Sequence, residues 1–215
     1  MASQVLSPAT IVSDPAVGTK AWTNPTNAAS SNDARATADA GTAGITEYLK
    51  ATNFGFTIPA GATIDGIVVE FERMESAAGV VSTDEHVKIV KGGTVGATNK
   101  ADTATDWPTA DAYKAYGSAT DLWGETWTAA DINATTFGMV IAGDISTGSF
   151  AATIGIDHIR ITVYYTTGVS LAVPTAVETD TALTIGARLT LALPTAVETD
   201  TALTIVATTA PQNTV

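Results

Sequence analysis

The sequence has no cysteine, which excludes disulfide bonds, thiolate catalysis and zinc sites with sulfur ligands. Histidine is scarce, with two residues in 215, and charged residues make up only 15% of the chain. No apolar run approaches the roughly 20 residues that a membrane-spanning helix needs. The N-terminal residues carry neither a basic segment nor a long apolar segment, so we expect no signal peptide.

Basic residues are also few, since ten lysines and arginines face 22 acidic residues and give a net charge of −12. A surface this acidic repels phosphate groups, which argues against nucleic acids and anionic membranes as partners. Hydrophobic residues make up 45% of the chain, enough to bury a core. Abundant threonine favours strands, and glycine and proline favour turns between short elements. The composition therefore predicts an all-β protein.

The C-terminal end holds a near-perfect tandem repeat. Residues 171–185 read LAVPTAVETDTALTI and residues 191–205 read LALPTAVETDTALTI, a period of 20 residues. Duplication at fixed spacing indicates one structural unit used twice. The unit contains no histidine, lysine or aromatic residue, so it suits packing and assembly better than catalysis.

Alternating apolar residues predict strands along the first 168 residues. In TIDGIVVEFERM, Ile67, Val69 and Phe71 share one face, and the glutamates share the other. Residues 87–89 repeat the pattern, and further strands are predicted at 9–12, 46–58, 137–142, 152–156 and 159–165. Residues 94–130 are predicted to be a long aromatic-rich excursion, with a capped helical turn at 128–131.

These strands predict an antiparallel two-sheet sandwich, jelly-roll-like, over residues 1–168. Residues 169–215 are predicted to form a β-strand repeat arm, because apolar residues alternate from Leu183 to Leu193. Pro174 and Pro194 are expected to end strands, since proline cannot donate to a ladder. So small a piece has too little core to be stable alone, and is expected to lie against other protein.

Candidate catalytic residues each have a simpler structural interpretation. Glu70 and Glu72 resemble a glycosidase carboxylate pair, but a solvated strand face explains them better. Asp84 and His86 are two apart and share a face in a regular strand, which leaves a metal or proton-relay role open. His158 follows Asp157, and strand neighbours point to opposite faces, so these two are not expected to pair. We expect no catalytic or metal-binding residues, no cofactor and no enzymatic activity.

Two other residue sets remain as alternatives. Several aspartates suit structural Ca²⁺ by chemistry, although no calcium-binding loop motif is present. Trp107, Trp123 and Trp127 are candidate glycan contacts, because tryptophan rings stack on sugars. The competing interpretation is that they close one end of the sandwich. The aspartates in question are Asp14, Asp84, Asp121, Asp131 and Asp144.

Four stretches carry a resemblance to a known family. NFGFTIPAGATIDGIVVEFER, KIVKGG, DLWGETWTAADINATTFGMVIAG and IDHIRITVYY lie within residues 22–165 and together resemble a module of tailed-bacteriophage virion proteins. The A-x-E-T-D-T-A-L repeat is similar to short repeats appended to phage structural proteins. The resemblance implies a virion component, such as a capsid decoration (cement) protein, a head fibre or a tail-associated protein.

The combined expectation is a non-enzymatic phage structural protein, most simply a capsid decoration protein that binds a particle lattice through many weak contacts. Its expected partners are the major capsid protein, or another virion protein, and copies of itself, as a trimer. Its expected location is the virion, assembled in the host cytoplasm and released by lysis. The alternative is a carbohydrate-binding module of a phage surface or tail fibre protein. The residues expected to mediate assembly are Leu171, Val173, Leu183, Ile185, Leu189, Leu191, Leu193, Leu203 and Ile205.

Overall fold

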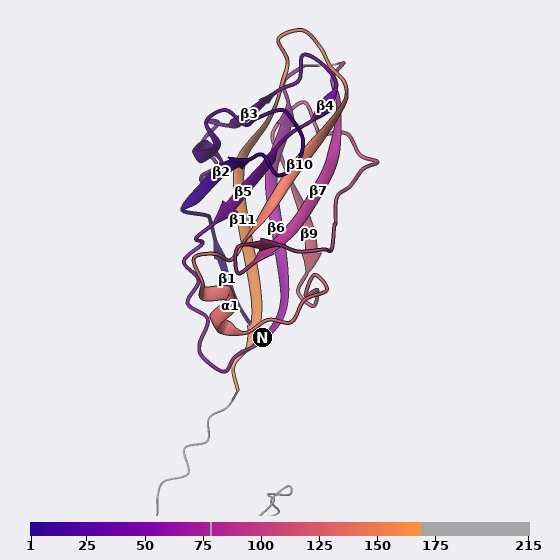
Figure 1. The fold of residues 1–215 in the computed structure, drawn as a ribbon. Coiled ribbons are helices and arrows are strands. Elements are labelled where there is room, and N and C mark those ends of the chain that lie inside the picture. Colours follow the sequence, from indigo (N-terminus) through magenta and orange to yellow (C-terminus); the bar gives the residue numbers. More distant parts are fainter. Residues whose placement is uncertain (78, 169–215) are drawn as a thin grey trace, which may run out of the picture. The chain divides into compact units, whose positions relative to one another are not determined.

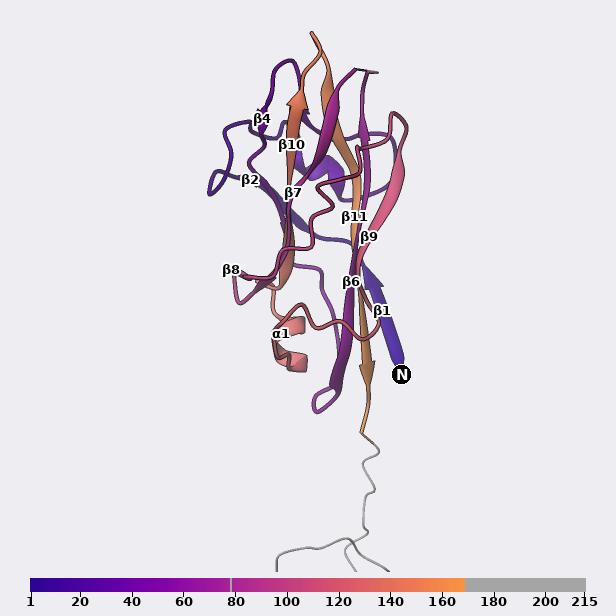
Figure 2. The same ribbon diagram turned by 90° about the vertical axis from the view of Figure 1, so that its right-hand side faces the viewer.

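Residues 1–77 and 79–168 are described by the computed structural model, and they form two antiparallel β-sheets packed face to face (Figure 2). The predicted all-β, jelly-roll-like sandwich is therefore confirmed. The elements are β1 (Ala2–Leu6), β2 (Thr10–Asp14), a 3-10 turn (Pro25–Ala28), β3 (Ala36–Asp39), β4 (Gly44–Ile45), β5 (Tyr48–Thr52), β6 (Thr63–Glu75), β7 (Val81–Lys91), β8 (Thr94–Val95), β9 (Ala112–Ser118), α1 (Ala129–Asn133), β10 (Gly138–Thr147) and β11 (Thr153–Thr166).

The first sheet, sheet A, has the strand order β1-β11-β6-β9, and β3 also pairs with β11. The second, sheet B, has the order β2-β5-β10-β7-β8, and β4 also pairs with β10. Figure 1 shows β1 starting at the end of the sandwich where β11 finishes, and Ala2 lies opposite Tyr165 in the register. The N-terminus and the last described residues are therefore neighbours.

The core lies between the two sheets and follows the alternation of the sequence. Ile67, Val69 and Phe71 of β6 are fully buried, as predicted, and Val87 and Ile89 of β7 face them from sheet B. The predicted strands at 152–156 and 159–165 are one strand, β11, with an irregularity beside Asp157. Trp22 is buried, and its indole N–H donates to the Glu47 carbonyl at 2.8 Å, so it anchors the N-terminal loops.

The expectation that Asp84 and His86 share a strand face is wrong. A bulge in β7 places Ala142 opposite His86 and the next residue, Gly143, opposite Asp84, so Glu85 is the extra residue. The bulge shifts the alternation by one position. Asp84 consequently points into the core, whereas His86 lies on the outer face of sheet B, 5.5 Å from the Tyr48 ring centroid.

The long excursion at 94–130 contains two strands that the sequence pattern did not predict, β8 and β9. β9 pairs with β6 from Ile67↔Ser118 to Arg73↔Ala112 and forms one edge of sheet A. β1, at the opposite edge, was also missed. Both strands are mostly exposed, so each lacks the clear alternation of a half-buried strand.

The helical turn predicted at 128–131 is confirmed as the start of α1. Thr128 accepts a hydrogen bond from the Asp131 backbone N–H, and the Asp131 carboxylate accepts one from the Thr128 N–H, a reciprocal capping box.

No helix in residues 1–77 and 79–168 is long and apolar enough to cross a membrane. The predicted repeat arm, 169–215, lies outside the described residues.

Candidate functional site

The largest buried polar cluster joins the two sheets around Asp84. Its carboxylate forms an ion pair with Arg73 of β6 and accepts hydrogen bonds from Trp107 Nε1 at 2.9 Å and Tyr116 Oη at 2.5 Å. The Asp102 backbone N–H donates to it at 3.0 Å. Arg73 is 2% exposed and Asp84 is 0% exposed, so both charges are desolvated. The cluster fastens sheet A to sheet B and offers no surface to a ligand.

The expectation that three tryptophans form an exposed glycan platform does not fit the structure. Trp107 and Trp123 are each 1% exposed, and their indole N–H groups donate to Asp84 and to the Ile67 carbonyl. Arg73 lies 5.2 Å from the Trp107 ring centroid. A sugar stacks on an exposed ring face, and these rings are packed inside the sandwich. Both rings therefore belong to the core of the sandwich.

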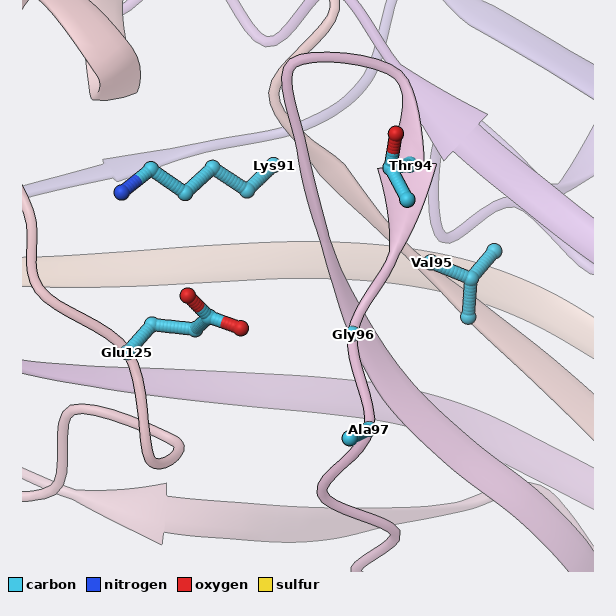
Figure 3. Close-up of a pocket in the computed structure, with 6 residues that line it drawn as sticks. All are labelled: Lys91, Thr94, Val95, Gly96, Ala97 and Glu125. Carbon is cyan, nitrogen blue, oxygen red and sulfur yellow. The ribbon is translucent and has the colours of Figure 1, made fainter.

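Trp127 is half-buried and lies near a shallow pocket of about 270 Å³ beside the β7–β8 turn. Figure 3 shows the Lys91 and Glu125 side chains on the same side of this turn. Lys91 Nζ is 5.2 Å from the Trp127 ring centroid and 3.7 Å from the Asp131 carboxylate. The lysine is thus already paired, and Glu125 places an acidic group at the rim of the pocket.

The outer face of sheet A carries a different group of polar side chains. Arg160 of β11 donates to both carboxylate oxygens of Glu70 on β6, each at 2.8 Å, which is a bidentate pair. The Arg160 guanidinium also lies 4.4 Å from the ring centroid of Tyr113 on β9. Tyr113 is 39% exposed and is the most accessible aromatic ring on this face. Glu70 is therefore held by a salt bridge.

His158, Ser7 and Tyr113 form a hydrogen-bonded row next to this pair. His158 Nε2 lies 2.8 Å from Ser7 Oγ, and Nδ1 lies 2.7 Å from Tyr113 Oη. A nucleophilic triad has a carboxylate on Nδ1, and here a phenol occupies that position. Glu72 lies opposite both His158 and Tyr113 in the strand registers. The row ties β1, β11 and β9 together across the sheet face.

Burial controls protonation in this row. Burial, with a smaller effect of the Arg160 charge, lowers the pKa of His158, so the imidazole is neutral at pH 7. Burial raises the pKa of the adjacent Asp157, which is 1% exposed and accepts a hydrogen bond from the Asn32 N–H at 3.0 Å. Within the part of the chain that the structure describes, no hydrogen bond joins Asp157 to His158.

The aspartates considered for Ca²⁺ lie apart from one another. Asp14 pairs with Lys50 at 3.3 Å, Asp121 pairs with Lys100 at 2.7 Å, and Asp131 caps α1. Among residues 1–77 and 79–168, no three histidine or acidic side chains are grouped so that they could hold a metal ion. Asp14, Asp121 and Asp131 thus serve local pairing and capping, and Asp84 is the buried partner of Arg73.

The residues expected to mediate assembly all lie outside the described residues, from Leu171 to Ile205. The site residues that sequence reasoning missed are Arg73, Tyr113 and Arg160. Arg73 carried a usable signal, because it continues the inward positions of β6 after Phe71. Tyr113 and Arg160 carried none, since their meeting depends on the pairing of β6 with both β9 and β11.

No model of a known protein family matches the sequence, and no curated protein matches it either. Among solved structures, the chain is similar to one described as "CBM4 structure and function", with a TM-score of 0.33 and 11% sequence identity. The alignment covers 74% of this chain and 92% of that one.

Proposed function

We propose that this protein is a non-enzymatic virion structural protein, a capsid decoration protein of a tailed bacteriophage that assembles through residues 169–215. The observation that carries the proposal is the position of the duplicated segment. Its first copy starts at Leu171, directly after β11 ends at Thr166. A sandwich with an appended tandem apolar repeat suits a protein that occupies many equivalent lattice sites, because many weak contacts sum by avidity.

The chemistry of the sandwich agrees with this function. Its buried ion pair, Arg73 with Asp84, holds the sheets together, and Glu70 on the outer face is paired with Arg160. These groups stabilise structure and take part in no arrangement of nucleophile, base and orienting carboxylate. The acidic surface disfavours non-specific association between copies.

The solution mass of the full chain, compared with that of a chain ending at Gly168, tests the assembly role. We expect the full chain to be a trimer and the shortened chain to be a monomer by light scattering. The same number of chains per particle for both proteins would contradict assembly through residues 169–215. Quantitative mass spectrometry of purified phage particles tests the decoration role, which requires a copy number comparable to that of the major capsid protein.

A carbohydrate-binding function is the second candidate, favoured by Tyr113 on the outer face of sheet A. An exposed ring beside carboxylate and guanidinium groups supplies the stacking and hydrogen bonding that a sugar needs. A glycan array compares the wild type with Tyr113→Ala and with Trp127→Ala. We expect Tyr113→Ala to remove every signal and Trp127→Ala to retain it. An array without signals for the wild type would eliminate this function.

A further inference from the structure

Strand β1 forms a free edge of sheet A. It pairs with β11 along one side, from Ala2↔Tyr165 to Leu6↔Ile161, without a register shift. Within the described residues, no backbone hydrogen bond joins its other side to any segment. An edge strand of this kind presents a row of unpaired N–H and C=O groups that can accept another strand.

β1 lacks the features that usually protect an edge. Its sequence, ASQVL, has no charged residue, no proline and no bulge. Val5 is 53% exposed and Met1 is 72% exposed, so the edge is also apolar. A five-residue edge strand that is uncharged, regular and apolar is suited to pairing with a further strand.

The other edges of the sandwich are protected. β9 carries Lys114 and is bent by Gly117, whose φ of +83° departs from strand geometry. β2 ends in Asp14, which pairs with Lys50. β8 has only two residues. Of the edge strands longer than two residues in the described part of the chain, β1 is the one with neither a charge nor a distortion.

β1 is nevertheless held firmly in place, from its inner side and its end. The Gln4 side chain accepts from the Thr57 N–H at 3.1 Å and donates to the Thr57 carbonyl at 3.3 Å. Ser7, just after the strand, bonds to His158 at 2.8 Å. These contacts fix the strand without using its free edge, so an incoming strand meets a preorganised template and its binding costs less ordering entropy.

The sequence supplies a segment of matching character in residues 183–193. Six apolar side chains alternate there with a face that carries one charge, Arg188, a pattern that predicts a strand. β11 delivers the chain to the end of the sandwich where β1 begins. A strand returning directly from that end in the same molecule would run parallel to β1, and parallel pairing is the less stable kind. A second copy has no such constraint.

We propose that the free edge of β1 receives residues 183–193 of a second copy as an added antiparallel strand. The proposal rests on the assembly role of residues 169–215 proposed above, and it names the surface that receives them. The arm and the β1 edge are different surfaces, so copies that pass their arms in one direction make heterologous contacts, and a closing rotation makes a ring. A trimer is the closed form expected here. Backbone hydrogen bonds supply the affinity, as in other cases of strand addition.

The absence of cysteine makes cross-linking a direct test, because every disulfide then comes from engineered residues. Val5→Cys is combined in the full chain with one cysteine at Ile185, Leu189 or Leu193, and the products are separated without reductant. A disulfide requires Cα atoms within roughly 7 Å, so only paired positions react. The matched control is Val12→Cys, an exposed valine on the protected edge β2.

We expect at least about tenfold more intermolecular disulfide with Val5→Cys than with Val12→Cys, with one arm position favoured by the register. If disulfides form only within single chains, the claim that a second copy donates residues 183–193 is refuted. If the chain is an oligomer but Val5→Cys forms no disulfide with any arm position, the claim that the β1 edge receives the arm is refuted. The assembly role of residues 169–215 would remain. A monomer without disulfides would overturn both, so the two failures are distinguishable.

Discussion

Replacing Asp84 by Asn tests whether the buried ion pair holds the two sheets together. The amide keeps the shape of the side chain and loses its charge, which leaves the guanidinium of Arg73, 2% exposed, without a counter-ion. Breaking a buried pair on one side costs about 3–5 kcal/mol. Trp107 and Tyr116 also lose a charged acceptor, so the upper part of this range is expected.

The free energy of unfolding is measured on the full chain by urea titration, followed by tryptophan fluorescence, since Trp107 and Trp123 are buried. The total free energy of unfolding of a domain is about 5–15 kcal/mol, so this loss would move the unfolding midpoint to a much lower urea concentration. Asp39→Asn is the control, because its carboxylate is 71% exposed and pairs with Lys20 on the surface. That change is expected to cost under about 1 kcal/mol.

A double-mutant cycle separates the ion pair from the rest of the cluster. Arg73→Met removes the partner charge, and the double variant Arg73→Met with Asp84→Asn leaves no unpaired charge. We expect a coupling free energy of about 2–3 kcal/mol, as for residues in one network. A coupling near zero, or a cost of Asp84→Asn no larger than that of Asp39→Asn, would refute the assignment of this pair as the link between the sheets.

Three further predictions concern protonation, capping and salt. Burial lowers the pKa of both His158 and His86, so the unfolded chain binds protons first and the free energy of unfolding falls as pH drops below about 6.5. In urea titrations at pH 7.5 and pH 5, His158→Gln should make the loss of stability between the two pH values smaller. A loss equal to that of the wild type would contradict this. Thr128→Ala removes the cap of α1 and should cost about 1 kcal/mol by the same assay, with a cost near zero opposing that role. Because each copy carries −12, we expect added salt to strengthen self-association in light scattering, and weakening would indicate ionic contacts between copies.

The central strands of the sandwich were predictable because burial on one face imposes alternation. Ile67, Val69 and Phe71 show this, and the capped turn at Thr128 was equally clear from local chemistry. The edge strands β1 and β9 were not, since exposed strands place few constraints on side chains. The bulge at Glu85 was also hidden, because it is defined by pairing with β10 and reverses the face of Asp84 relative to His86.

The buried pair shows a different limit of sequence reasoning. Arg73 continues the inward alternation of β6, so its burial was visible in the sequence as a charge on an apolar face. Its partner Asp84 was not visible, because it stands directly before Glu85, the bulge residue that shifts the alternation of β7. The alternative interpretation of the tryptophans as glycan contacts failed for a similar reason. The sequence does not show which rings are exposed, and the indole N–H of Trp107 donates to the buried carboxylate of Asp84.

The distribution of charge links the sandwich to the way copies meet. Eight of the nine lysine and arginine side chains in the described part of the chain form an ion pair with an acidic side chain of the same molecule. The excess negative charge remains on the surface, so the proposed attraction between copies has to come from uncharged groups. Strand β1 supplies an uncharged backbone edge with Val5 exposed beside it, and residues 183–193 supply a segment with one basic charge. Contact between an uncharged edge and a slightly basic strand is the pairing that an acidic protein accepts at least electrostatic cost.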